Sequence, residues 1–354
     1  MAAASGFVTP VAYENKLVIG IDTLSTKLNR QQCRSGLLWT LSYLGATLPT
    51  SQAASAIKWQ SDSALVIYPD LLGLGKTGEV AFEKICDSLR HTRQYQQTGS
   101  VPAGAFVAVM VGCSEHYYAI TEAPTSLNAF KKLHHGKRST FMIEHSLISG
   151  RARHLFFGRV AAPKLWALAV QKKERKVSAE AIDVMPNGQL RFLIYNENGR
   201  LSAAPADKDN LAGKPAKCMW CHEGQLQRPF NTEVNDVATL VPAVDSMNNA
   251  LRTLRKTFDS GFSFEPHRDH TYMEILYISY LEPTLQQLSR EWRMKSEDIR
   301  LLLRLNKRHL HPEFSFGDSL YTRSEIKAAA PYSIPVPDDV REWRLSDPNF
   351  LRTK

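Results

Sequence analysis

The chain has 354 residues, a length that suits one large domain or two ordinary ones and is ample for an apolar core. Its hydrophobic content of 43% and charged content of 22% are close to globular averages, which indicates a folded, soluble protein. No stretch approaches the roughly 20 apolar residues that span a bilayer, so we expect no transmembrane segment.

The net charge of +9 is concentrated in one part of the chain. Residues 131–176 contain twelve Lys or Arg and only two acidic residues, Glu144 and Glu174. A basic region of this kind can steer an acidic protein partner, an anionic polymer or a membrane surface towards the protein. It also occurs as an ordinary solvated surface without a dedicated ligand.

The first half of the chain has a mixed α and β pattern. Short β-branched runs predict strands at 15–22 and 63–68, and apolar residues at helical spacing predict a helix over 80–89. The apolar run 104–121 is interpreted as two strands around a bend.

Two further segments predict a β-meander. Residues 177–184 and 189–195 are strand-like and flank a Pro-Asn-Gly turn at 186–188. A second turn is expected at 196–199, and the segment 201–217, rich in Ala, Pro, Gly and Asp, is expected to be a linker or long loop.

From residue 235 onward the apolar spacing becomes helical, with further runs at 273–292 and 299–305. We therefore predict an α+β fold, in which a mixed α/β N-terminal region with a β-meander precedes a mainly α-helical C-terminal region. The predicted divisions are a domain at 1–200, a linker at 201–217, a helical region at 218–330 and an irregular, proline-rich tail at 331–354.

The strongest chemical signal is the pentapeptide Cys218-Met-Trp-Cys221-His222. This C-x-x-C-H spacing resembles the haem-attachment motif of c-type cytochromes. The resemblance implies that Cys218 and Cys221 form thioethers with the two vinyl groups of one haem c, and that His222 is the proximal iron ligand. The resemblance covers these five residues and the helical stretch after them. The chain departs from small cytochromes in one respect: a helix leads into their motif, whereas a Pro/Gly-rich loop precedes Cys218 here.

The sixth iron ligand would decide the function, since a strong second ligand favours electron transfer and a vacant position admits peroxide or a gas. The candidates after the motif are Met247, His267, His270 and Met273. Met247 belongs to an apolar helical face and is expected to pack in the core. His267 and His270 are expected in a loop just before a helix, and Met273 follows within one turn, so we expect the ligand to come from 267–273. We expect electron transfer, with a haem-based peroxidase or gas-binding protein as the alternative.

A different set of ligands would suit zinc. Cys218, Cys221, His267 and His270 together supply four tetrahedral donors and would make a zinc-stabilised binding protein. The gap between the two pairs is much longer than in small zinc folds, and this interpretation leaves His222 without a role. A redox-active dithiol is a third possibility for the cysteine pair.

The haem interpretation has consequences for location and partners. Haem is attached to this motif outside the cytoplasm, so we expect a periplasmic or extracytoplasmic protein, although the first thirty residues show no secretory signal. A leader would have been removed or would be absent from this chain. The basic stretch 131–176 is then a candidate docking surface for an acidic redox partner protein.

Two weaker motifs are not expected to function. Residues 70–77 lie where a phosphate-binding loop would lie, but Asp70 replaces its first glycine. Residues 283–304 have the spacing of a helix-turn-helix, yet two packed amphipathic helices give the same pattern and the basic excess lies elsewhere. Nucleotide and nucleic-acid binding are therefore not expected.

Overall fold

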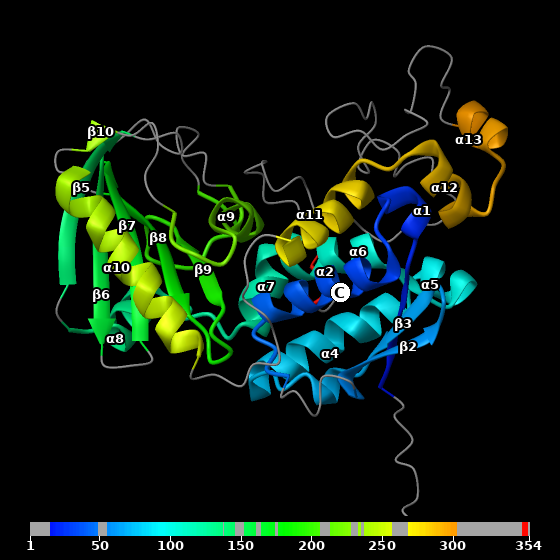
Figure 1. The fold of residues 1–354 in the computed structure, drawn as a ribbon, viewed down its shortest axis with the longest axis horizontal. Coiled ribbons are helices and arrows are strands. Elements are labelled where there is room, and N and C mark those ends of the chain that lie inside the picture. Colours follow the sequence, from blue (N-terminus) through cyan, green and yellow to red (C-terminus); the bar gives the residue numbers. More distant parts are fainter. Residues whose placement is uncertain are drawn as a thin grey trace, which may run out of the picture.

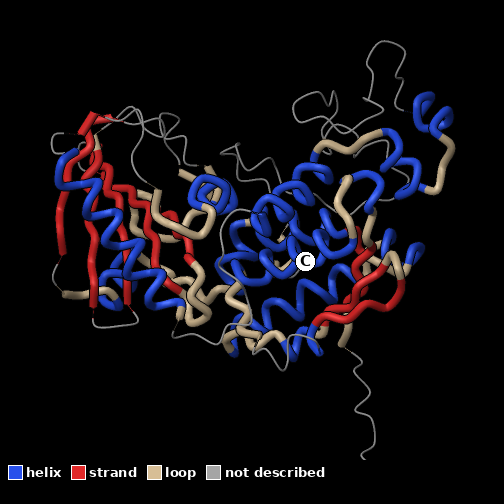
Figure 2. The backbone as a smooth tube through the Cα atoms, in the orientation of Figure 1, coloured by secondary structure: helices blue, strands red, loops and turns tan. Residues whose placement is uncertain are grey.

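The computed structural model describes residues 15–48, 55–136, 138–145, 152–160, 164–173, 176–205, 213–227, 233–234, 237–256, 268–302 and 349–352. The fold is α+β, as the sequence predicts: two separate sheets flank a layer of helices (Figures 1 and 2). One continuous apolar cluster joins residues from both sheets and from the helices between them.

The smaller sheet has four short strands in the order β2-β3-β1-β4. They are β1 (Leu17–Gly20), β2 (Ile57–Ser61), β3 (Ala64–Ile67) and β4 (Val101–Pro102). β1 pairs antiparallel with β3 and parallel with β4. The strands predicted at 15–22 and 63–68 are thus confirmed.

The helices of the first half surround this sheet and continue away from it. They are α1 (Thr23–Thr26), α2 (Arg30–Tyr43), α4 (Lys76–Arg90), α5 (Arg93–Thr98), α6 (Ala103–Val107), α7 (Ser114–Ile120) and α8 (Leu127–Leu133). A 3-10 turn, Pro69–Leu71, precedes α4, and a π-helical turn, Ala108–Gly112, connects α6 to α7. The predicted helix over 80–89 is the central part of α4.

The two strands predicted for 104–121 are wrong, because this segment is helical throughout α6, the π-helical turn and α7. Every residue of α6 and the turn is buried. A helix that is covered on all sides shows no amphipathic period, so a continuous apolar run does not distinguish it from a buried strand.

The larger sheet has six strands in the order β10-β5-β6-β7-β8-β9. They are β5 (Arg138–His145), β6 (Arg153–Val160), β7 (Lys164–Lys173), β8 (Lys176–Val184), β9 (Leu190–Tyr195) and β10 (Glu233–Val234). Strands β5 to β9 follow one another in sequence and are all antiparallel neighbours. The predicted strands at 177–184 and 189–195 are confirmed as β8 and β9, whereas β5, β6 and β7 were not predicted.

Strand β9 forms one edge of the larger sheet, and α7 protects it. The amide of Phe192 donates to Tyr117 Oη at 3.0 Å, and the amide of Ile194 donates to Tyr118 Oη at 3.2 Å. These bonds satisfy backbone groups that an edge strand would otherwise present to another chain. Helix α10 (Val237–Arg255) crosses in front of this sheet and α8 lies behind it (Figure 1).

The last described helices are α11 (Arg268–Leu281), α12 (Leu285–Trp292) and α13 (Ser296–Leu302). α11 packs on α2 and α6. The contact with α2 is close enough that a Cβ atom added at Gly36 would lie 2.9 Å from the Met273 amide nitrogen. α12 and α13 bury Leu288, Trp292 and Ile299, the pattern of two packed amphipathic helices. α11 thus contacts helices on the other side of the predicted linker at 201–217. The division into domains stays a prediction.

The described part of the C-terminal tail lies against α4 and α7. The Phe350 ring stacks on His116 at 5.6 Å, and its amide donates to His116 Nε2 at 2.8 Å. Lys84 Nζ donates to the Leu351 carbonyl at 2.9 Å. Within the described part of the chain, every helix is too short or too polar to serve as a transmembrane segment.

Candidate haem-attachment site

The C-x-x-C-H motif lies on helix α9 (Pro215–His222), which packs against β9. The helix has a proline at its first position, where the missing N–H costs no hydrogen bond, and it ends at Glu223 in a left-handed conformation (φ 44°). Cys218, Cys221 and His222 occupy positions i, i+3 and i+4, so both thiols and the imidazole share one helical face.

Both motif cysteines are free thiols; Cys218 is partly buried and Cys221 is exposed. Burial raises the pKa of each thiol, and the charge of Glu180 adds to the effect at Cys218. A raised pKa keeps the thiols protonated at neutral pH, whereas redox-active dithiols depend on a lowered pKa. The environment of the pair therefore disfavours the redox-dithiol interpretation.

The His222 ring is held in one orientation. Its Nδ1 atom lies 3.0 Å from the Gln225 carbonyl oxygen, which can only accept, so Nδ1 carries the proton. The Gln227 amide is farther from the same atom, at 3.4 Å, and does not alter this assignment. Burial lowers the pKa of His222 to about 4, so the ring is neutral at pH 7 and Nε2 has a free lone pair.

No hydrogen bond reaches His222 Nε2 from any residue that the structure describes. A neutral imidazole whose Nδ1–H is fixed by a backbone carbonyl is the form in which Nε2 binds a metal. The ring also packs on Phe192, with centroids 5.4 Å apart. The C-x-x-C-H spacing singles out His222 as a candidate iron ligand, and the structure adds the orientation of its ring.

The residues between and after the motif cysteines anchor the helix. Met219 is fully buried, and Trp220 packs edge-on against Tyr277 of α11 with centroids 5.5 Å apart. The loop that follows is held by α10, since Arg255 Nη2 donates to the Gly224 carbonyl at 2.6 Å. Asn248 also fixes this loop: its side chain accepts from the Leu226 amide at 2.9 Å and donates to the Leu226 carbonyl at 2.7 Å.

Two of the candidate sixth ligands have packing roles. Met247 on α10 is 5% exposed and belongs to the apolar core, as predicted. Met273 on α11 is 1% exposed and lies where α11 crosses α2 at Gly36. Neither sulfur adjoins the motif face in any contact that the structure gives.

His270 is the described candidate that lies near the motif. The prediction that it sits in a loop is wrong, because α11 begins at Arg268 and places His270 in its first turn, 1% exposed. The ring packs edge-on against Tyr43 at 5.9 Å and Trp39 at 6.3 Å. His267 lies outside the described residues.

An aromatic cluster connects the two histidines. Phe192 contacts both His222, at 5.4 Å, and Tyr43, at 6.3 Å, while Tyr43 contacts His270. His270 Nδ1 also lies 3.6 Å from Glu274 Oε1, one helical turn along α11. The fold thus brings His222 and His270 to one cluster, with Phe192 and Tyr43 linking their rings.

Sequence reasoning missed two charged residues of this region. Burial, with the charge of Glu223, raises the pKa of Glu274 to about 7, and burial lowers the pKa of Arg255 to about 10. The spacing of four between His270 and Glu274 was the only local signal for the carboxylate. Nothing in the sequence near Arg255 indicates that it reaches the motif loop.

The zinc interpretation needs Cys218, Cys221 and His270 in one place. Among the described residues, no three His, Cys, Asp or Glu side chains are close enough together to hold one metal ion. His267, the fourth donor of that set, is outside the described part. Cys218, Cys221 and His270 therefore do not by themselves form a zinc site in the described part of the chain.

The residues present fit a covalently attached haem in the chemistry of their donors. Cys218, Cys221 and His222 offer two thiols and a neutral imidazole with an unpaired Nε2 on one face of one helix. Such a group supplies an iron centre whose axial ligands tune its redox potential. Cys218 and Cys221 would hold its edge, and His222 its iron.

The basic stretch is only partly described. Lys131, Lys132 and Arg138 are exposed, whereas Arg153 is buried and pairs with Glu180 at 3.2 Å.

No protein family matches this sequence, and no curated protein or solved structure is significantly similar to it.

Proposed function

We propose that this chain is a c-type haem protein that transfers electrons through one haem bound to Cys218, Cys221 and His222. The observation that carries the proposal is the placement of two thiols and an oriented, neutral imidazole on one face of α9. Haem attachment implies maturation outside the cytoplasm, so the proposal includes a periplasmic or extracytoplasmic location.

Electron transfer is preferred to haem-based catalysis because the aromatic cluster around His222 also contains a second imidazole, that of His270, which could serve as an axial ligand. His270 is buried in the aromatic cluster that also contacts His222. Phe192 packs on the His222 ring and Tyr43 packs on the His270 ring. A peroxidase or gas-binding protein would instead need an open position at the iron.

The test is to produce the chain with export and haem-maturation machinery and to record absorption spectra of the oxidised and reduced protein. We expect a red protein that keeps its haem through acid denaturation, since thioether bonds survive unfolding. Cys218→Ala with Cys221→Ala should abolish covalent attachment, and His222→Ala should disturb the iron spectrum. The exposed His91 provides the control, because His91→Ala should change neither property.

The same spectra test electron transfer. A low-spin spectrum that becomes high-spin in His270→Ala, or in His267→Ala or Met273→Leu, would support a second protein ligand. A high-spin spectrum unaffected by all three variants would contradict electron transfer and favour catalysis or gas binding. A colourless protein with one zinc ion per chain would overturn the haem proposal in favour of zinc.

A further inference from the structure

The tail segment, residues 349–352, is docked on α7 and α4, and its central contact is with a histidine. The Phe350 ring lies nearly parallel to the His116 imidazole, with centroids 5.6 Å apart and an angle of 13° between the rings. Phe350 and Leu351 also pack against the apolar core. The tail segment is therefore held by both ring stacking and apolar contact.

His116 uses both of its ring nitrogens in hydrogen bonds to backbone groups. Nδ1 lies 2.8 Å from the Val109 carbonyl oxygen, which can only accept, so Nδ1 carries a proton. The Phe350 amide, which can only donate, lies 2.8 Å from Nε2, so Nε2 carries none. The docked tail segment therefore requires the neutral imidazole.

A second proton on His116 is incompatible with this contact. It would be bound at Nε2, and the new N–H would point at the N–H of Phe350. The His116 side chain is fully buried, so water does not separate the two donors. Burial also lowers the pKa of His116, which keeps the ring neutral while the tail segment is docked.

The charged groups around this contact come from α7, α4 and the tail segment itself. Glu115 on α7 pairs with Arg352 at 2.8 Å, and Lys84 on α4 donates to the Leu351 carbonyl at 2.9 Å. The Glu115 charge favours a protonated His116, but burial is the larger effect. Both members of the Glu115–Arg352 pair are exposed, and exposed pairs contribute little to stability. The contact between Phe350 and His116 is therefore the one that decides docking.

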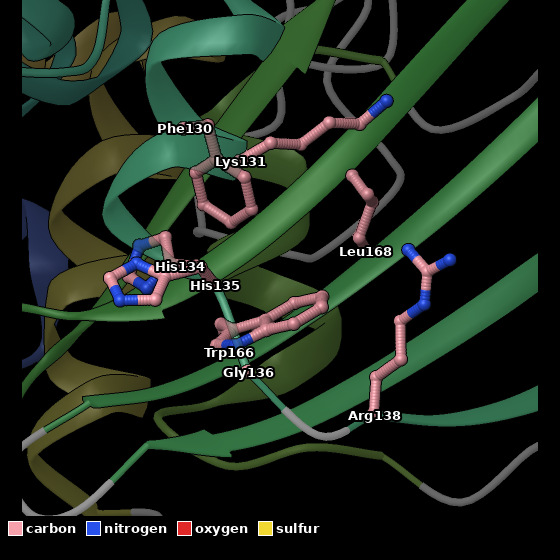
Figure 3. A pocket seen from close by; sticks show the side chains of 8 residues that line it. All are labelled: Phe130, Lys131, His134, His135, Gly136, Arg138, Trp166 and Leu168. Carbon is pink, nitrogen blue, oxygen red and sulfur yellow. The ribbon is translucent and has the colours of Figure 1, made fainter.

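His134, whose ring lies beside Trp166 at the end of α8 (Figure 3), is bonded differently. Its Nε2 atom lies 2.9 Å from the Asp183 carboxylate, which accepts whether the ring is neutral or charged. Protonation of His134 would strengthen that hydrogen bond, because it would place a positive charge beside a carboxylate. Protonation of His116 would instead break the bond to Phe350.

We propose that the tail segment is an acid-released latch, held on α7 while His116 is neutral and freed when His116 takes up a proton. Release exposes the imidazole to water, where its pKa returns to about 6.5. Because the docked pKa is lower, the latch is fully stable above that pH and weakens as the pH falls below it. Docking should be about tenfold weaker at pH 5.5 than at pH 7.5. The latch uses no residue of the C-x-x-C-H motif, so it is independent of the haem proposal.

The test is digestion of the full chain by a carboxypeptidase that is active at both pH values, followed by mass spectrometry. A free peptide of residues 345–354 corrects for the enzyme's own pH dependence. Relative to the peptide, we expect removal of residues 349–352 to be about tenfold faster at pH 5.5 than at pH 7.5. His116→Gln, which has no titrating ring, should abolish this difference, and His91→Gln, at an exposed position, should retain it. Equal relative rates at both pH values in wild type, or an unchanged difference in His116→Gln, would overturn the latch.

A second measurement leaves the buried histidine in place. Phe350→Ala removes the stacked ring from the tail segment and weakens docking, so the pKa of His116, followed by NMR titration of the full chain, should rise towards about 6.5. The His116 signal is identified by its loss in His116→Gln. Arg352→Ala is the matched control, because Arg352 is an exposed residue of the same segment, and it should raise the His116 pKa less. A His116 pKa that is the same in wild type and in Phe350→Ala would overturn the proposal.

Discussion

At the scale of single residues, the ionic group Asp183–Arg191–His134 determines how the meander joins the helical layer. Arg191 on β9 binds the Asp183 carboxylate and also donates to the Thr121 carbonyl at 2.8 Å, just beyond α7. Burial raises the pKa of Asp183, but the charge of Arg191 and the hydrogen bonds from His134 and Arg191 outweigh it, so the net pKa is lower than usual. The carboxylate is therefore ionised inside the folded chain.

Asp183→Asn should lower the free energy of unfolding at pH 7 by about 3–5 kcal/mol, because it leaves the buried Arg191 charge without a counterion. A carboxyl with a lowered folded pKa contributes stability above about pH 4 and loses it as the pH falls through the folded pKa. Wild type should thus lose more stability than the variant between pH 5 and pH 2. Urea unfolding at several pH values measures this difference, and parallel pH profiles would contradict it.

At the scale of helices and strands, local patterns predicted β8, β9 and the turn between them, because that turn carries its own Pro-Asn-Gly residues, but they missed β5, β6 and β7. The prediction of two strands over 104–121 was wrong because the fold of this segment depends on a helix far along the chain. A Cβ atom at Gly104 would lie 2.3 Å from the Leu276 carbonyl oxygen and 2.6 Å from Tyr280 Cβ. The glycine marks a backbone contact between α6 and α11, which sequence spacing cannot reveal.

The same limit applies to the candidate site. The C-x-x-C-H motif could be identified because its chemistry is local, and its helix places all three groups on one face. The groups that surround it come from remote elements: Tyr43 from α2, Phe192 from β9 and Arg255 from α10. No local pattern relates these residues to Cys218, so only the folded chain identifies them.

Gly104→Ala tests the contact between α6 and α11. Alanine favours an isolated helix by about 1 kcal/mol over glycine, so propensity alone predicts a gain in stability. The backbone contact predicts the opposite, a loss of about 1–3 kcal/mol, because the α11 backbone cannot move aside like a flexible side chain. Thermal and urea unfolding measure the sign. The exposed Val80 on α4 is the control, since Val80→Ala should change stability by less than about 0.5 kcal/mol.

At the scale of the whole molecule, strand β9 lies between the motif region and the basic end of α8. Neighbouring residues of a strand point to opposite faces, so Arg191 faces the His134 side and Phe192 faces the side of His222. The basic end of α8 and the motif helix therefore lie on opposite faces of one sheet. A partner attracted to the basic surface would approach the protein across a single strand from the proposed haem.

If the proposed electron transfer holds, this basic surface should set its charge dependence. Lys131→Glu with Lys132→Glu should slow electron exchange with the anion ferricyanide several-fold at low ionic strength and speed exchange with a tripositive hexaammine complex, because the surface field changes sign locally. Both effects should shrink near 0.15 M salt, where the screening length is about 8 Å. Stopped-flow absorption measures the rates. The control is Lys295→Glu with Arg300→Glu, the same charge change at exposed positions beside and within α13. Equal effects from both pairs would show that only net charge matters, and no effect from the α8 pair at low salt would show that this surface does not steer a partner.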